Sequence, residues 1–227
     1  MRILAIDTAL AACAAAVFDS NGGRTLAAES LTMARGHAEA LMPLIARVMD
    51  KAETEFAELD RIAVTVGPGS FTGLRVGISA ARGIALASGK PAVGLSTLSA
   101  YAAPHIAQED GAAVVVAIDA KHGHVYLQVF ATTGRTLIPP VVATVAEAVH
   151  AAVPGSARIV GSGAALVAAD WPAEALPPLL VEPREAPAIE WVARLGAAAA
   201  QSDSGPTPLY LRPPDARRQD GARLPRR

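Results

Sequence analysis

The chain has 227 residues, of which 52% are hydrophobic, and its formal net charge is −1. This length suits one large domain or two small ones with a sizeable core, and the near balance of charge excludes a protein that binds nucleic acid over a generally basic surface. A single cysteine, Cys13, excludes an internal disulfide and indicates a reducing compartment. No uncharged apolar run approaches the roughly 18 residues of a membrane helix, so we expect a cytoplasmic protein that does not associate with a membrane.

Strand-like and helix-like segments alternate through the first hundred residues. The run ILAIDTALAACAAAVFDSNG predicts a β-hairpin, because two apolar stretches flank a short turn and the second ends at a glycine turn. Apolar residues at helical spacing, from Leu41 to Val48, predict a helix over about residues 37–51. The other elements predicted in this half are strands over about residues 24–33, 61–66 and 92–95 and a helix over residues 73–88.

The second half repeats this plan. The run VVVAIDAKHGHVYLQVFATTG carries the same AID triplet, and Asp119 follows Asp7 by 112 positions. A helix over about residues 145–152, a strand over 158–160 and a helix over 186–200 are predicted after it. Alternating strands and helices favour an α/β fold. The repeat predicts two lobes, which we place at residues 1–104 and 105–205.

Residues 206–227 differ in composition from both lobes. The last sixteen residues hold six arginines and two aspartates, a net charge of +4, together with three prolines. A charged, proline-rich segment without apolar periodicity is predicted to be a disordered tail. The alternative is a weak electrostatic contact with an RNA backbone.

A glycine-rich loop, GPGSFTGLRVG, lies between the strand over residues 61–66 and the helix that follows. It matches neither the Walker pattern nor a dinucleotide-binding fingerprint, although a strand–loop–helix junction offers backbone N–H groups to an anion. Gly73, Gly77 and Ala81 recur every four residues, with Ala80 beside them. A glycine inside a helix costs about 1 kcal/mol relative to alanine, so we expect a close approach of another backbone, from this fold or from a partner.

Three stretches together resemble the TsaB (YeaZ) family. They are MRILAIDTA at the start, GPGSFTGLRVGISAARGIALASGKPAVGLSTLSAYA in the first half, and LYLR near the end. The resemblance implies two actin-like (ASKHA, ribonuclease H-like) lobes, the second smaller and more degenerate. It also implies a non-catalytic scaffold that dimerises with its paralogue TsaD and works with the ATPase TsaE. That complex transfers threonylcarbamoyl to N6 of an adenosine in the anticodon loop of tRNAs that read ANN codons, so contact with tRNA is expected to be indirect.

The resemblance also implies where the partner binds, because two helices of the first lobe form the contact with TsaD in this family. We expect the apolar stripe of residues 37–48 and the small-residue face of residues 73–88 to be exposed and to form that interface. The same stripe could pair with itself in a homodimer of the isolated protein. No cofactor is expected to bind tightly, and ATP or ADP only at the partner interface. The predicted interface residues are His37, Leu41, Leu44, Ile45, Val48, Gly73, Val76, Gly77, Ala80 and Ala81.

No metal site is predicted. TsaD-like enzymes carry a His-x-x-x-His pair where this chain has Thr97 and Tyr101, and neither replaces an imidazole ligand. His122 and His124 share a turn of the second hairpin, but a third ligand is not evident nearby.

Asp7 and Asp119 keep an alternative open, a stand-alone actin-fold ATPase or kinase. In actin-like ATPases, carboxylates at the ends of the two first strands face a shared cleft and hold a metal–nucleotide complex. Thr8 could contact a phosphate, and Gly161 with Gly163 weakly resembles an adenosine-binding pair. The loop after Asp7 reads ALAA, however, and lacks the donors that wrap phosphates. These five residues are therefore predicted to form a vestigial nucleotide cleft, and no catalytic residue is assigned.

Overall fold

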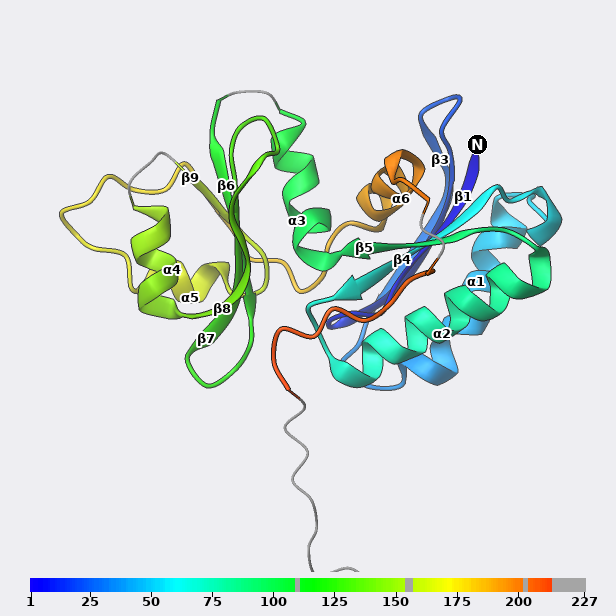
Figure 1. The fold of residues 1–227 in the computed structure, drawn as a ribbon, viewed down its shortest axis with the longest axis horizontal. Helices are drawn as coiled ribbons and strands as arrows, with labels where there is room; N and C mark the ends of the chain where they lie inside the picture. Colours follow the sequence, from blue (N-terminus) through cyan, green and yellow to red (C-terminus); the bar gives the residue numbers. More distant parts are fainter. Residues whose placement is uncertain (109–110, 154–156, 202–203, 214–227) are drawn as a thin grey trace, which may run out of the picture.

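The computed structural model describes residues 1–108, 111–153, 157–201 and 204–213. Two lobes lie side by side, each built on one five-stranded sheet (Figure 1). The two strand orders are β3-β2-β1-β4-β5 and β10-β9-β6-β7-β8, so each sheet has the first strand of its lobe at the centre. The internal repeat predicted from the AID triplets is therefore confirmed as a repeat of the sheet topology.

The first sheet mixes antiparallel and parallel pairs. The hairpin of β1 and β2 is antiparallel, and β4 and β5 are added in parallel on the other side of β1. Its edge strand β3 pairs with β2. The strands are β1 Arg2–Asp7, β2 Ala12–Asp19, β3 Arg24–Thr32, β4 Arg61–Gly67 and β5 Ala92–Ser96.

The second sheet repeats these pairings. The central strand β6 is antiparallel to β7 and parallel to β9, with β8 and β10 at the two edges. Its strands are β6 Ala113–Asp119, β7 His124–Phe130, β8 Thr136–Thr144, β9 Ala157–Val160 and β10 Leu180–Glu182.

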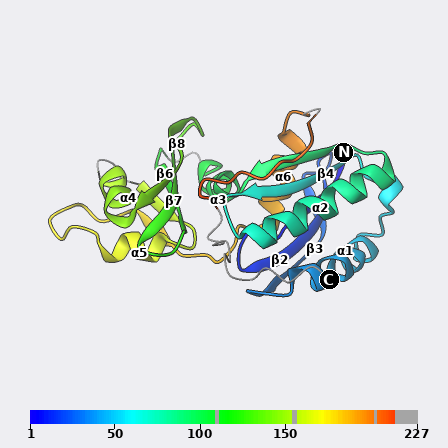
Figure 2. The same ribbon diagram turned by 60° about the horizontal axis from the view of Figure 1, so that its bottom comes forward.

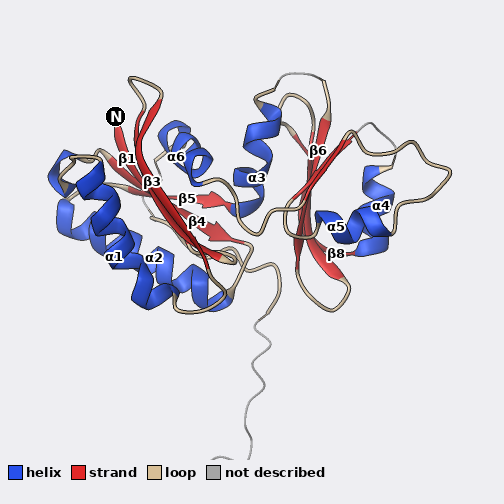
Figure 3. Ribbon diagram, turned by 180° about the vertical axis from the view of Figure 1, so that it is seen from behind, coloured by secondary structure: helices blue, strands red, loops and turns tan. Residues whose placement is uncertain are grey.

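Helices cover both faces of each sheet, as buried strands require. On the first sheet α1 (His37–Lys51) and α2 (Phe71–Ser88) lie next to each other on one face (Figure 2). On the second sheet α4 (Val145–Ala152) and α5 (Ala164–Ala169) cover the outer face, and α3 (Thr97–Ile106) the face toward the first lobe (Figure 3). A short 3-10 helix, η1, spans Phe56–Glu58. Within the described ranges, no helix is both long enough and apolar enough to cross a bilayer.

The last helix among the described residues, α6 (Ile189–Ala198), belongs to the first lobe. Its buried residues Ile189, Val192 and Ala193 pack against the first sheet on the face opposite α1 and α2. The Arg61 guanidinium donates to the carbonyls of Gly196 (2.8 Å) and Ala199 (2.6 Å) at the helix end. The predicted second lobe, residues 105–205, is therefore wrong at its C-terminal end, because the chain returns to the first sheet.

The boundary at residue 104 also needs correction, because it falls inside α3. This helix was not predicted: it carries Pro104, and its apolar residues give only a weak amphipathic pattern. Leu98 and Tyr101 pack with the second sheet, whereas Ala100 packs in the core of the first. A helix covered from two sides lacks the polar face that reveals most surface helices.

The predicted tail divides into two parts. Residues 206–213 are described, and Pro206 is buried against the first lobe. That part is therefore packed, which contradicts the predicted disorder. The arginine-rich part, residues 214–227, lies outside the described residues.

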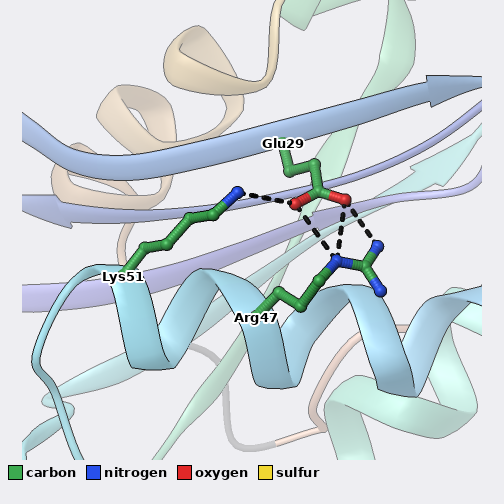
Figure 4. A network of polar contacts seen from close by, with 3 residues as sticks. All are labelled: Glu29, Arg47 and Lys51. Carbon is green, nitrogen blue, oxygen red and sulfur yellow. Dashed lines mark hydrogen bonds and ion pairs between the residues drawn. The ribbon is translucent and has the colours of Figure 1, made fainter.

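The edge of the first sheet is joined to α1 by an ion-pair network (Figure 4). The Glu29 carboxylate on β3 accepts hydrogen bonds from Arg47 Nε (3.0 Å) and Lys51 Nζ (3.2 Å). These bonds hold the pKa of Glu29 down at about 2. Charged side chains on an edge strand also discourage pairing with another sheet.

Candidate functional site

A cavity of about 510 Å³ lies between the lobes. We call it the interlobe cleft. Its walls come from the loop after β1, the starts of α1 and α2, strand β7, the turns after β6 and β9, and the chain before and after α6. The lining side chains that carry polar groups are His37, Ser70, Asp119, Lys121, Tyr126, Ser162, Glu185, Tyr210 and Arg212.

Asp7 ends β1 but is sealed away from this cleft. Its side chain has no exposed surface. One carboxylate oxygen, Oδ1, accepts hydrogen bonds from the Thr65 hydroxyl and from the Ala9 N–H (3.0 Å), while Oδ2 is buried without a hydrogen-bond partner among the described residues. Burial raises the pKa of Asp7, and the two hydrogen bonds only partly oppose it. In this arrangement Asp7 holds the loop that follows it rather than a ligand.

The glycines of the GPGSFTGLRVG stretch account for this seal. The Thr8 hydroxyl donates to the Gly73 carbonyl (2.7 Å). A Cβ on Gly73 would lie 2.1 Å from the Thr8 carbonyl oxygen, and one on Gly77 would lie 2.4 Å from Thr8 Oγ1. Gly69 likewise would meet the Ala9 carbonyl at 2.3 Å. The predicted close approach is confirmed, and the neighbour is the chain's own loop after β1.

Asp119 occupies the equivalent place at the end of β6 and faces the cleft. Its Oδ2 lies 2.6 Å from Lys121 Nζ, and its Oδ1 accepts from the Lys121 N–H (2.8 Å). Burial opposes ionisation, but the bonds and charge of Lys121 prevail and lower the pKa of Asp119. Lys121 and His122 have φ of 64° and 54°, in the left-handed region that non-glycine residues rarely adopt. The turn therefore points its lysine back at its aspartate.

The glycine pair of the second lobe also packs against protein backbone. A Cβ on Gly161 would lie 2.4 Å from the Ala117 carbonyl oxygen, and Gly163 N donates to that oxygen (2.9 Å). Between them, Ser162 Oγ accepts from the Asp119 N–H (3.1 Å). These glycines let the turn after β9 close onto the end of β6.

Comparison with known proteins identifies the family. The model of TsaD, tRNA N6-adenosine threonylcarbamoyltransferase, matches residues 31–174. The tRNA threonylcarbamoyladenosine biosynthesis protein TsaB of Escherichia coli is 37% identical over 126 residues, 56% of this chain and 53% of that protein. An uncharacterized protein of Mycobacterium tuberculosis is 34% identical over 217 residues, 95% of this chain and 93% of its own length. The structure of YeaZ from Pseudomonas aeruginosa superposes with a TM-score of 0.77 at 26% identity, covering 92% and 99% of the two chains.

The chain belongs to the TsaB (YeaZ) family. Its match to the Escherichia coli TsaB spans about half of that protein's length. The two sheets of matching topology and the likeness to YeaZ confirm the predicted fold of two actin-like lobes.

For this TsaB-family chain, the predicted interface stripe is wrong in its orientation. The side chains of Leu41, Leu44, Ile45 and Val48 are at most 1% exposed and pack in the core beneath α1. The most apolar stripe of a surface helix covers its own sheet, because that burial stabilises the fold. These four residues cannot contact a partner while the lobe is folded.

The remaining predicted interface residues divide by exposure. Gly73, Gly77 and Ala81 are buried, and His37, 9% exposed, places its Nε2 3.1 Å from the Leu10 carbonyl oxygen. Val76 and Ala80 are half-buried at the margin of the core.

Sequence reasoning missed the outward face of α1 and α2. Met42 on α1 is 48% exposed, and Leu86 on α2 is 87% exposed. Gly83 is exposed in the middle of α2, and a Cβ there would meet nothing within 4 Å. Gly83 could have pointed to this face from the sequence. A glycine in a helix interior lowers stability, and no contact within the fold requires one there.

The positions considered for a metal serve the packing of α3 and of the second hairpin. Thr97 is fully buried, and the Tyr101 hydroxyl donates to the Arg184 carbonyl (2.8 Å). His124 Nδ1 lies 2.8 Å from the His122 carbonyl oxygen. Over the described ranges, no three His, Cys, Asp or Glu side chains gather as metal ligands.

Proposed function

We propose that this chain is a non-catalytic accessory subunit in tRNA threonylcarbamoyladenosine biosynthesis. It would dimerise with a TsaD paralogue, stabilise it and activate it. The family supports the pathway, since the Escherichia coli relative is a tRNA threonylcarbamoyladenosine biosynthesis protein. In the proposed complex TsaD carries out the transfer, TsaE supplies the ATPase, and this chain contacts tRNA only indirectly.

The observation that carries the non-catalytic role is the state of the two strand-end carboxylates. A metal–nucleotide complex needs both to converge on one open cleft. Asp7 is sealed beneath the Thr8–Ala9 loop, and Asp119 is already neutralised by Lys121. Bringing Asp7 to the cleft would require Gly73 to release the Thr8 loop, which it contacts through backbone atoms. These contacts favour a chain whose contribution to the reaction is made through its partner.

The outward face of α1 and α2 is the proposed partner surface. Met42 and Leu86 expose apolar area there, and Gly83 leaves a notch in α2 that another helix could enter closely. The two helices lie side by side (Figure 2), so one partner helix could contact both. A homodimer of the isolated chain would use the same face, and ATP or ADP would bind only where this chain meets its partner.

Size-exclusion chromatography with light scattering tests this proposal. We expect the chain and its TsaD paralogue to form a stable heterodimer, with ATP or ADP as added variables. Gly83→Arg should prevent the heterodimer, because a long charged side chain would fill the notch. Ala165→Arg on exposed α5 is the matched control and should leave the heterodimer intact. Separate elution of the two wild-type proteins under every condition would refute the proposal.

The alternative, a stand-alone ATPase or kinase, makes a different prediction. It requires the isolated chain to bind ATP through Asp7 and Asp119. Isothermal titration of ATP and Mg²⁺ into the chain alone should show no binding if the accessory role is right. Micromolar affinity that is lost in Asp119→Asn would favour the alternative.

A further inference from the structure

The segment LYLR, residues 209–212, has no role in the proposed function, yet the structure places it across both lobes. In Figures 1 and 2 the orange-red trace of residues 206–213 runs along the first lobe and ends between the lobes. Leu209, Tyr210, Leu211 and Arg212 all line the interlobe cleft. We call residues 206–212 the strap.

The strap is held on the first lobe by hydrogen bonds to the backbone of the strap. Arg82 Nε on α2 donates to the Pro206 carbonyl (3.0 Å), and Leu209 N donates to the carbonyl of Val66 at the end of β4 (2.7 Å). Gly67, with φ of 114°, makes room for this path, because a Cβ there would lie 2.7 Å from the Leu209 carbonyl oxygen. A glycine in this conformation beside the strap indicates that the contact between the strap and the first lobe is part of the fold.

An aromatic stack holds the middle of the strap. The rings of Tyr210 and Phe71 have centroids 4.5 Å apart, and the Arg75 guanidinium lies 3.9 Å from the Phe71 centroid on α2. Such stacked and cation–π pairs stabilise beyond the area that they bury. The strap is thereby fixed to the start of α2, at one wall of the cleft.

The end of the strap reaches the second lobe. Arg212 Nη1 donates to the Ala120 carbonyl (2.9 Å), in the turn that carries Asp119 and Lys121. A charged donor makes this bond stronger than a neutral one. The strap therefore joins the end of β4 and the start of α2, in the first lobe, to the turn after β6, in the second.

We propose that the strap fixes the opening of the interlobe cleft, with Arg212 as its latch on the second lobe. Two lobes that meet at the crossovers and at the shared helix α3 can still rotate about them, and a further attachment at the cleft restrains that rotation. The strap would thus determine which side chains of the two lobes face each other across the cleft. The latch would act in the isolated chain, without any partner.

Electron–electron distance measurements on the full chain test the latch. Spin labels at Asp50→Cys on α1 and Ala165→Cys on α5 report on one lobe each, and both positions are exposed. Cys13 is fully buried, so labelling of the native cysteine should be slight. We expect one narrow distance distribution in the parent chain and a broader, shifted one in Arg212→Ala. Arg135→Ala, which removes an exposed arginine of the second lobe, is the matched control.

Two further measurements distinguish a lost latch from a damaged fold. Tyr210→Ala should broaden the same distribution, because it weakens the seat of the strap on the first lobe. Exchange of the Leu209 amide should be about tenfold faster or more in Arg212→Ala, the loss expected when a hydrogen bond from a charged group is removed. Thermal unfolding should stay cooperative in both variants. An unchanged distance distribution in Arg212→Ala, or a Leu209 amide that exchanges freely in the parent chain, would overturn the proposal.

Discussion

The two lobes share one sheet topology but close the end of their first strand differently. In the first lobe the long helix α2 presses its glycines onto the loop after β1, and Asp7 becomes fully buried. In the second lobe the corresponding helix α5 has only six residues, and Asp119 stays at the cleft beside Lys121. One topology therefore supports a sealed carboxylate in one lobe and an accessible one in the other.

The aspartates by themselves therefore do not decide what the two strand ends can do. Both aspartates are present in equivalent positions. Their surroundings differ: the loop after β1, held against Gly73 and Gly77, buries Asp7, whereas Asp119 pairs with Lys121 in a turn that faces the cleft.

Among substitutions of glycine by alanine, Gly73→Ala should destabilise the fold the most. Its Cβ would lie 2.1 Å from a backbone oxygen, so the loop after β1 or the whole of α2 must move. We expect a loss of about 3 kcal/mol in the free energy of unfolding, measured by chemical denaturation. Gly163→Ala, whose Cβ would meet atoms at 3.0 Å or more, should cost less.

Gly83→Ala is the control on the same helix. Nothing lies within 4 Å of its Cβ, so the substitution should raise the free energy of unfolding by up to about 1 kcal/mol. Equal destabilisation by Gly73→Ala and Gly83→Ala would mean that helix propensity, rather than the contact with Thr8, governs α2.

Replacing Asp7 with alanine should lower the free energy of unfolding more than replacing Asp119 does. Asp7→Ala leaves the Thr65 hydroxyl and the Ala9 N–H without their acceptor, and should cost about 1–3 kcal/mol in the free energy of unfolding. Asp119→Ala removes an ion pair whose lysine is 75% exposed, so the cost should stay below about 1 kcal/mol. A larger cost at Asp119 would contradict the contrast between sealed and accessible carboxylates.

The pH dependence of stability should have opposite signs at the two aspartates. The folded-state pKa of Asp7 is raised above 3.8, so stability falls as the pH rises from 3.8 through the folded-state value. Asp7→Asn should abolish that fall in denaturation curves recorded over this interval. The pKa of Asp119 is lowered, so its contribution is present above 3.8 and is lost as the pH falls below it. Asp119→Asn should remove that acid-side loss.

The smallest change in stability is expected from side chains at the edges of the two sheets. Glu29 on β3 has a folded-state pKa of about 2, because it bonds to Arg47 and Lys51. Its stabilisation should be present above 4.5 and lost as the pH falls toward 2. Carbon-detected NMR titration should show this value, and Arg47→Ala should raise it. On the second sheet, Gln128 Nε2 bonds to the Thr136 hydroxyl on β8, a neutral pair with no such titration.

The sequence predicted well those features that depend on neighbours along the chain. Helix α1 was predicted over residues 37–51 and begins and ends there, because its apolar residues recur at helical spacing. The duplicated hairpins that end in Asp7 and Asp119 also follow from local alternation and turn residues. Helix α3 was missed because it is apolar on more than one side.

Local sequence patterns are therefore enough to predict two α/β lobes, the family and a close approach at Gly73 and Gly77. Three features depend on long-range packing instead: the apolar stripe of α1 faces inward, α6 returns to the first sheet, and Arg212 reaches the turn after β6. The physical reason is the range of the interactions. Periodicity and turn chemistry act over a few residues, whereas the direction of a buried face depends on which distant strand needs to be covered.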